Sequence, residues 1–257
     1  MTAPSAIILA AGKGTRMKSD LPKVCHLVGG RPMVCAVVDA CIEAGCERVV
    51  AVVGYKQELV REALADYGDT IGYAEQIEQH GTGHAVRCAM PAFEGVGEGT
   101  PVYVLCGDGP LIRSETLATI LETHRANNAS ATLATAVLDD PTGYGRIKRD
   151  AVGGFVRILE QKNATEADLA IREVNPSYYC FQLDALRWGL ENIAPNETTG
   201  EEYVTDIPEL LLGRGDAVEV IDAVPSEDVL SINTVEQLAE VDRVFRERVS
   251  NTRAGEK

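Results

Sequence analysis

The sequence has no hydrophobic run long enough to cross a membrane and no excess of positive charge. A membrane helix needs about 18 or more apolar residues in a row, and no stretch of this chain approaches that length. The apolar N-terminal stretch also lacks the charged lead-in and the cleavage site of a signal peptide. The 24 basic and 39 acidic residues give a formal net charge of −15, which repels polyanions. We therefore expect a cytoplasmic protein with no membrane or nucleic-acid partner.

Paired cysteine motifs are missing as well. The seven cysteines include no C-x-x-C pair, and most of them lie inside apolar stretches, so the usual zinc and disulfide-exchange signatures are absent. A free cysteine packs like a small hydrophobic residue, and we predict reduced, buried thiols. The 45% apolar and 25% charged residues are close to the average of a globular protein.

The first half of the chain alternates short β-rich runs with amphipathic stretches. The β-rich runs cover residues 6–10, 48–53, 102–106 and 131–137, and the amphipathic stretches cover residues 33–43, 57–66 and 114–127. This order predicts an α/β fold with a Rossmann-like, mostly parallel sheet flanked by helices. Residues 143–173 are richer in turns and alternating residues, which predicts a small antiparallel lid. Ligands of such sheets bind beyond the carboxyl ends of the strands, so the loops there should carry the chemistry.

A glycine-rich turn with several cations directly follows the first β-rich run. Gly12 and Gly14 can adopt positive φ and direct backbone N–H groups at phosphate oxygens. Lys13, Arg16 and Lys23 can neutralise the charge of a triphosphate. The turn lacks the third glycine of a dinucleotide fingerprint, and no P-loop motif occurs, which argues against a dehydrogenase and a P-loop NTPase. The alternative is a glycine turn with solvated cations.

Two carboxamides, Gln76 and Gln79, stand before a turn of small residues that opens a helix. A carboxamide offers a donor and an acceptor together, which matches the edge of uracil, and the backbone at Gly81 can come close to the ring. We therefore predict a nucleobase site here. The alternative is a plain helix entry with Thr82 as its cap.

An aspartate in a tight turn follows the apolar run at residues 102–106. The Asp108 carboxylate there should face the ligand crevice, and Mg²⁺ prefers hard oxygen ligands while it keeps several waters. Asn233 follows a strand-like run at residues 229–232 and is the second candidate ligand; its alternative role is a helix cap. We predict a Mg²⁺ site formed by Asp108 and Asn233.

In their order, these motifs resemble the uridyltransferase domain of bacterial N-acetylglucosamine-1-phosphate uridyltransferases, within the sugar-nucleotide pyrophosphorylase superfamily. The most specific stretches are residues 9–17, 21–23, 76–85, 107–108, 110–111, 139–147 and 201–207, with Asn233. The resemblance implies a Mg²⁺-dependent transfer of UMP from UTP to N-acetylglucosamine 1-phosphate. This reaction releases pyrophosphate and gives UDP-N-acetylglucosamine, a peptidoglycan precursor for cell-wall synthesis. A single domain is then expected over residues 1–250.

The expected domain has a nucleotide-binding half at residues 1–137, a sugar-binding half with the lid at 138–233, a C-terminal helix at 234–250 and a flexible tail at 251–257. The resemblance implies that Arg16, Lys23 and Asp108 are catalytic. The motifs and the resemblance together assign the nucleotide to Leu9, Ala10, Ala11, Gly12, Lys13, Gly14, Gln76, Gln79, Gly81, Thr82 and Gly107. The resemblance assigns the sugar to Gly145, Glu160, Asn175, Tyr203 and Thr205.

Three departures from the family pattern leave part of this assignment open. The usual Asn-Thr-Gly is Asn175-Pro176-Ser177 here, and Cys106 and Gly109 replace the residues more common beside Gly-Asp. An alternative is therefore a uridylyl- or thymidylyltransferase acting on glucose 1-phosphate or another sugar 1-phosphate, and a further one is an inactive sugar-nucleotide sensor. The chain also ends before the acetyltransferase β-helix of the bifunctional members. We accordingly expect no acetyltransferase activity, no trimer formed through that β-helix, and a monomer or small homo-oligomer.

Overall fold

The computed structural model describes residues 2–14, 17, 19–230, 232 and 234–255, with side chains as far as Asn251. The strands are β1 (Ser5–Ala10), β2 (Leu27–Val28), β3 (Arg31–Pro32), β4 (Arg48–Val53), β5 (Ile71–Glu75), β6 (Pro101–Cys106), β7 (Ala131–Val137), β8 (Gly145–Arg149), β9 (Phe155–Leu159), β10 (Glu173–Gln182) and β11 (Val218–Asp222). The helices are α1 (Met33–Glu43), α2 (Gln57–Ala63), α3 (Thr82–Ala89), α4 (Ser114–Ala126), α5 (Glu166–Leu169), α6 (Leu183–Asn192), α7 (Ile207–Arg214) and α8 (Val235–Gly255).

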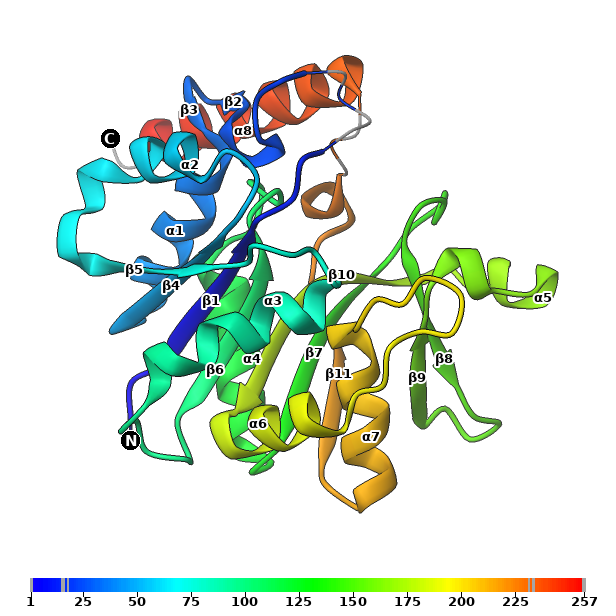
Figure 1. Cartoon of the computed structure of the whole chain (residues 1–257). Helices are drawn as coiled ribbons and strands as arrows, with labels where there is room; N and C mark the ends of the chain where they lie inside the picture. The colour runs from blue at the N-terminus through cyan, green and yellow to red at the C-terminus, as the bar shows by residue number, and fades with distance from the viewer. Residues whose placement is uncertain (1, 15–16, 18, 231, 233, 256–257) are drawn as a thin grey trace.

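The main path of the sheet runs in the order β11-β7-β10-β6-β1-β4-β5, with β1 near its middle (Figure 1). Neighbouring strands on this path are parallel, except that β10 is antiparallel to both β6 and β7. β1 and β4 bury almost all of their residues, as expected for parallel strands covered on both faces. The predicted mostly parallel sheet is therefore confirmed, and β10 is its antiparallel member.

The predicted antiparallel lid is also present, and it branches from β10. The register of β10 against β7 shifts between Val174 and Tyr178. Val174 pairs with both β7 and β8, and the next residue, Asn175, lies opposite Gly145 of β8. β8 and β9 then form an antiparallel hairpin that stands to one side of the main sheet (Figure 1). The register shift thus lets one strand serve both the sheet and the lid.

Helices cover both faces of the sheet and enclose two cores. On one face α1 and α4 bury apolar side chains such as Val38 and Ile120. On the other face α3, α6 and α7 bury Val86, Leu186 and Leu211. These helices leave the carboxyl ends of β1 and β6 to be covered by loops, which is where the sequence predicted the chemistry.

The C-terminal helix α8 packs against the N-terminal region. Its Val241 shares a small buried core with Met33, and Asp242 accepts a hydrogen bond from the Gly29 N–H at 2.7 Å. α8 continues to Gly255, beyond the predicted helix end and into the segment expected to be a flexible tail. Ion pairs three and four residues apart along the helix favour this continuation.

The apolar run at residues 229–232 is not a strand where the structure describes it, which corrects the sequence interpretation. Val229 ends a 3-10 helix, η7 (Ser226–Val229), and neither Leu230 nor Ile232 is extended into a strand. Val229 and Ile232 are nevertheless buried, each in a different core. The apolar character of the run therefore reflects burial of an irregular segment and not strand pairing.

The cysteines, all of which the structure describes, are free, and all but Cys88 and Cys106 are buried. This agrees with the prediction of reduced, mostly buried thiols. None of the described helices is long and apolar enough to span a bilayer.

Candidate active site

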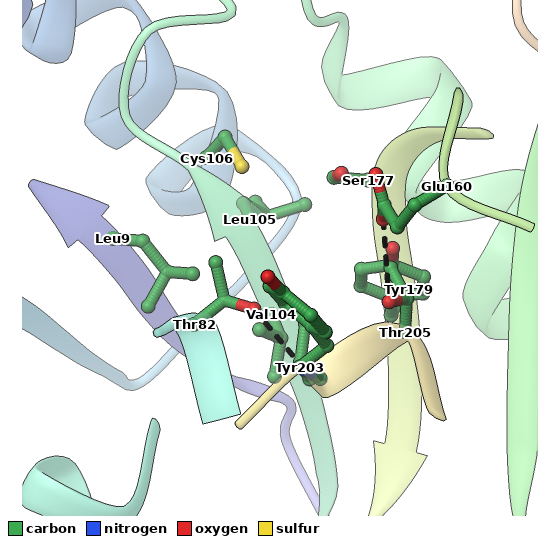
Figure 2. A pocket seen from close by; sticks show the side chains of 11 residues that line it. Leu9, Thr82, Val104, Leu105, Cys106, Glu160, Ser177, Tyr179, Tyr203 and Thr205 are labelled. Atoms are coloured by element: carbon green, nitrogen blue, oxygen red, sulfur yellow. Dashed lines mark hydrogen bonds between the residues drawn. The ribbon is translucent and has the colours of Figure 1, made fainter. Parts of the chain in front are cut away.

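Three adjoining cavities surround the carboxyl ends of β1 and β6. The glycine-loop cavity, of about 300 Å³, lies between the turn after β1 and the turn before α3. The inner cavity, of about 170 Å³, lies between β6, the N-terminus of α3 and the segment before α7 (Figure 2). The lid cavity, of about 230 Å³, lies beneath β8 and the N-terminal part of β10. Cys106 lines all three cavities, so they meet at the end of β6.

The predicted site residues are largely gathered around these cavities. The glycine-loop cavity is lined by Leu9, Ala11, Gly12, Gly14, Gln76, Gln79, Gly81 and Thr82 of the nucleotide set and by the catalytic candidates Lys23 and Asp108. The inner cavity is lined by Glu160, Tyr203 and Thr205 of the sugar set. The lid cavity is lined by Gly145, Glu160 and Asn175 of the sugar set. Side chains from separate predicted halves thus line one continuous group of cavities.

Five predicted site residues are not placed there. Ala10 is buried inside the sheet, and the Gly107 N–H donates to a β1 carbonyl oxygen at 2.9 Å. Lys13 is exposed, with its Nζ 5.3 Å from the centre of a tyrosine ring. These three residues do not line the described cavities. Arg16 and Asn233 lie outside the described residues, so their roles stay predictions.

The glycine turn places a cation beside the predicted metal ligand. Gly14 has a φ of +66°, and a Cβ on it would lie 2.6 Å from the Cβ of Lys23. Glycine is therefore required both by the backbone conformation and by the close approach of Lys23. Lys23 Nζ lies 2.5 Å from Asp108 Oδ2, and these side chains are 17% and 33% exposed. The turn after β1 and the turn after β6 are joined by this ion pair at the mouth of the glycine-loop cavity.

Gln76 is held rigidly at the end of β5. It is 4% exposed, and its Nε2 lies 3.0 Å from the Gly81 carbonyl oxygen and 3.1 Å from His84 Nδ1. Because the amide nitrogen has both of these partners, the Oε1 atom is the group that the carboxamide can offer to a ligand. Gln79 Nε2 donates to the Ala11 carbonyl oxygen at 2.8 Å. The second carboxamide therefore ties the base turn to the glycine turn.

The start of α3 docks tightly on the segment before α7. Gly81 has a φ of +99°, and a Cβ on it would lie 2.3 Å from the Glu202 carbonyl oxygen. The Gly83 N–H donates to the same oxygen at 2.8 Å. Gly81, not Thr82, is the N-cap of α3, and the Thr82 hydroxyl accepts from the Val204 N–H at 3.1 Å. The helix-cap interpretation of Thr82 is therefore wrong: its hydroxyl is used by the neighbouring segment.

Part of the wall of the inner cavity is polar and includes the half-buried Glu160 carboxyl (Figure 2). Thr205 Oγ1 donates to Glu160 Oε1 at 3.4 Å. Burial raises the pKa of Glu160, although the bond from Thr205 and the charge of Lys162 oppose this. The Tyr203 hydroxyl donates to a Glu201 carboxylate oxygen at 2.6 Å. Such a wall of carboxyl and hydroxyl groups can bind the hydroxyl and amide groups of a sugar.

The floor of the lid cavity comes from the paired strands β8 and β10. Asn175 is buried, and its Nδ2 donates to the Tyr179 hydroxyl at 2.6 Å. Gly145 lies opposite Asn175, and a Cβ on it would lie 3.0 Å from Ile158 Cγ2. The glycine therefore lets β8 and β9 approach each other closely at the cavity.

Sequence reasoning missed several residues that line the cavities. Ser177 and Tyr179 line the inner cavity, and Glu201 lines the glycine-loop cavity. Glu201 and Ser177 stood within or beside the motifs that carried the resemblance, but nothing in the residue types alone marked them. The signal for Ser177 is conformational, because its φ is +67°, and the sequence does not show it.

No group of three or more His, Cys, Asp or Glu side chains that could hold a metal ion occurs among the described residues. Asp108 nevertheless presents its carboxylate at the junction of the glycine-loop and lid cavities. A Mg²⁺ ion that keeps its waters and binds substrate phosphates needs only one or two protein oxygens. The chemistry of Asp108 therefore fits such an ion.

The fold is that of a nucleotide-sugar pyrophosphorylase. A UDP-glucose pyrophosphorylase, whose crystal structure was solved in complex with UDP-glucose, superposes with a TM-score of 0.74 over 96% of this chain and 100% of that one. The two sequences are 18% identical, so this likeness concerns the fold alone. The model of the MobA-like NTP transferase domain matches residues 6–168 of this chain. The chain therefore belongs to the MobA-like NTP transferase domain family, and the predicted nucleotidyltransferase class is confirmed.

More similar relatives are bacterial proteins named bifunctional protein GlmU. The one from Heliobacterium modesticaldum is 45% identical over 95% of this chain and 52% of its own length. Those from Geobacillus sp. strain WCH70 and Pelobacter propionicus are 44% and 42% identical over 95% and 96% of this chain. The chain spans about half the length of these relatives, since it covers 52% and 53% of the latter two.

Proposed function

We propose that this chain catalyses the Mg²⁺-dependent transfer of UMP from UTP to N-acetylglucosamine 1-phosphate, with release of pyrophosphate. The observation that carries the proposal is that the glycine turn, Gln76, Lys23 and Asp108 share one cavity, and that Glu160, Tyr203 and Thr205 line a second cavity next to it. Identities of 45% and 44% to bifunctional GlmU proteins over nearly the whole chain support the same assignment. A cytoplasmic location and a monomeric or small homo-oligomeric state remain predictions.

The uracil base is expected beside Gln76. The amide nitrogen of Gln76 is bound to the Gly81 carbonyl oxygen and to His84, so the side-chain oxygen would accept the N3–H of uracil. Cytosine has no hydrogen on N3, so it would place an acceptor against this oxygen. The rigid carboxamide therefore supports selection of UTP over CTP.

The reaction depends on placement and on neutralisation of charge. The attacking oxygen of a sugar phosphate is already ionised at neutral pH, so in-line attack on the α-phosphorus requires orientation more than a general base. Lys23 places its ammonium group in the glycine-loop cavity, where it would offset the charge that develops on pyrophosphate. Arg16 is expected to share this role.

Asp108, with Asn233 as the second predicted ligand, would hold the Mg²⁺ ion. When bound, the ion would supply positive charge at the phosphates of both substrates. Lys23 Nζ lies 2.5 Å from Asp108 Oδ2. This ion pair would hold the Asp108 carboxylate at the proposed boundary between the nucleotide and the sugar phosphate.

The sugar is expected in the inner cavity, with its phosphate towards Asp108. Glu160 lines both the inner and the lid cavity, and it would accept hydrogen bonds from sugar hydroxyl groups. Thr82 and Tyr203 line both the glycine-loop and the inner cavity. They would therefore lie between the nucleotide and the sugar.

A substrate panel tests the proposal directly. The purified chain is incubated with each common NTP, each of several sugar 1-phosphates and Mg²⁺, and pyrophosphate release is measured. We expect the highest kcat/KM for UTP with N-acetylglucosamine 1-phosphate, and loss of turnover when EDTA is added. A clear preference for glucose 1-phosphate would replace the proposed acceptor. Binding of UDP-sugars without Mg²⁺-dependent pyrophosphate release would instead indicate a sensor.

A further inference from the structure

Ser177 adopts a backbone conformation that is costly for any residue with a side chain. Its φ of +67° lies in the left-handed region, and only Lys56 and Asn128 share this feature among the described non-glycine residues. Glycine adopts such angles without a steric penalty. Asn128 is exposed in the turn after α4, whereas Ser177 lines two of the cavities of the active site. Strain of this kind persists where the surrounding structure or the function requires it.

The Ser177 hydroxyl lies at the boundary between the inner cavity and the lid cavity. The residues that line both cavities are Cys106, Glu160 and Ser177, and Figure 2 shows the three around one end of the inner cavity. Ser177 lines the inner cavity together with Cys106 and Tyr179. The Ser177 N–H donates to Asn175 Oδ1 at 3.1 Å. The backbone of Ser177 is thus held in place at this boundary.

A sugar 1-phosphate bound as proposed would lie beside this boundary. Its phosphate would be near Lys23 and Asp108, which line both the glycine-loop and the lid cavity, and its ring would be in the inner cavity. The ring atoms bonded to the phosphate-bearing C1 are C2 and the ring oxygen, and these would therefore lie beside Ser177. Among these neighbours, the C2 substituent differs between sugar phosphates: it is an acetamido group in N-acetylglucosamine 1-phosphate and a hydroxyl in glucose 1-phosphate.

We propose that Ser177 is a specificity-determining residue whose hydroxyl contacts the C2 substituent of the sugar 1-phosphate, and that the strained backbone is retained because it places this hydroxyl. The inference rests on the proposed function, which it extends to one contact. A hydroxyl can donate to the carbonyl oxygen of an acetamido group or accept from its N–H. A glycine at this position would relax the backbone and lose that contact.

Two substitutions separate the hydroxyl from the strain. Ser177→Ala keeps the Cβ and removes only the hydroxyl. We expect kcat/KM for N-acetylglucosamine 1-phosphate to fall about 3- to 10-fold, the range for one lost hydrogen bond, while KM for UTP is unchanged. The preference over glucose 1-phosphate should fall by a similar factor. Ser177→Gly should lose the same preference while its Tm rises by about 2–4 °C, because the strain is released.

Asn128→Gly is the matched control, since it relaxes a φ of +47° at an exposed site away from the cavities. It should raise Tm without changing any kinetic constant. If Ser177→Ala is folded, as judged by its Tm, and keeps the wild-type preference between the two sugar phosphates, the inference is overturned. If the wild-type chain releases no pyrophosphate with any NTP and sugar phosphate, the proposed function fails first, and this contact fails with it.

Discussion

The nucleotide side and the sugar side of the active site are built in different ways. On the nucleotide side, Gly12, Gln76 and Asp108 each follow the end of a strand of the main sheet within two residues. On the sugar side, Glu160 follows a strand of the lid, and Tyr203 lies in a loop segment before a short 3-10 helix, η6 (Val204–Asp206). Positions at strand ends are fixed by the sheet itself, whereas the sugar side depends on contacts between distant segments.

The two sides of the active site also differ in their electrostatics. The nucleotide side relies on backbone groups and on the Lys23–Asp108 ion pair. The sugar side brings carboxyl groups into a partly buried setting, where desolvation raises the pKa of Glu160. Burial, together with the charges of Glu209 and Glu160, also raises the pKa of Asp206 to about 6. Sheet topology therefore fixes the positions of the residues on the nucleotide side. The sugar side depends instead on side-chain chemistry, which can vary within one fold.

Substitution of Asp228, whose ion pairs connect the two sides, should lower the stability of the fold more than the other substitutions below. The Asp228 side chain in η7 is 1% exposed, and it forms ion pairs with Arg113 at 2.5 Å and with Arg248. Arg113 comes from the loop after β6, while Asp228 lines the lid cavity. Asp228→Ala removes the buried partner that both guanidinium groups share. We expect the free energy of unfolding to fall by about 3 kcal/mol, measured by urea denaturation.

An exposed ion pair on α8 provides the control for this experiment. Glu247 pairs with Arg243 at 2.7 Å, and its side chain is 59% exposed. Glu247→Ala should lower the free energy of unfolding by about 0.5 kcal/mol or less. Similar losses in the two variants would show that the Asp228 cluster does not join the two sides.

The next largest effect is expected on kcat, when either member of the Lys23–Asp108 ion pair is replaced. Lys23→Ala and Asp108→Ala should each lower kcat by at least about 100-fold, the scale of one lost transition-state contact. Steady-state pyrophosphate release measures this effect. Lys148→Ala removes a lysine of the lid that pairs with Asp168 at 3.0 Å, and it should keep near-normal kcat. Near-normal turnover in Lys23→Ala or Asp108→Ala would exclude that residue from the mechanism.

The nucleotide side could be predicted from the sequence better than the sugar side. The glycine turn and Asp108 were predictable because each stands directly after an apolar run, and strand ends meet at one edge of a parallel sheet. Gln76 was predicted from its carboxamide, which stands before a turn of small residues that opens a helix. Even there, the sequence did not show that Gly14 is required by the approach of Lys23. It also could not show that the Thr82 hydroxyl binds the Val204 N–H, because that partner is far along the chain.

The sugar side could not be derived from the residues alone, and its predicted members came from a family resemblance. Its geometry depends on the antiparallel insertion of β10 and on the register shift between Val174 and Tyr178. Neither feature has a periodicity that a single sequence reveals. Ser177 lies inside this shifted segment, and no residue type there indicates its φ of +67°.

The partly buried carboxyl of Asp206 allows a pH test of the sugar side. Its pKa in the folded protein is about 6, above the ordinary 3.8, so ionisation of this carboxyl destabilises the fold. The full cost applies above about pH 6, decreases between pH 6 and pH 3.8, and is absent below pH 3.8. A rise of this size corresponds to about 3 kcal/mol. We expect a gain of about 2 kcal/mol in Asp206→Asn at about pH 7.5, because the carboxyl is partly exposed. Urea denaturation should show this gain vanishing towards pH 4.

Asn substitution at the exposed Asp222 is the control for this pH series, and it should leave the unfolding free energy nearly unchanged at every pH. A gain in Asp206→Asn that persists below pH 4 would show that the carboxyl charge is not its cause. In that case the electrostatic contrast between the two sides would lose its main support.

The smallest effect is expected when a tyrosine hydroxyl of the sugar side is removed, and removal of a tyrosine hydroxyl elsewhere serves as the control. The Tyr203 hydroxyl bonds to Lys162 Nζ, to Glu201 at 2.6 Å and to Thr199 at 2.7 Å. Tyr203→Phe should raise KM for the sugar phosphate about 3- to 10-fold through loss of one hydrogen bond, with little change in kcat.

Tyr67→Phe removes a phenol that bonds to Asp39 and Arg31 on the opposite part of the nucleotide half, and it should leave both kinetic constants unchanged. A lower kcat with unchanged KM in Tyr203→Phe would show that this hydroxyl stabilises the transition state and not only the bound substrate. The sugar side would then take part in the chemistry as well as in recognition, and the division of labour between the two sides would have to be redrawn.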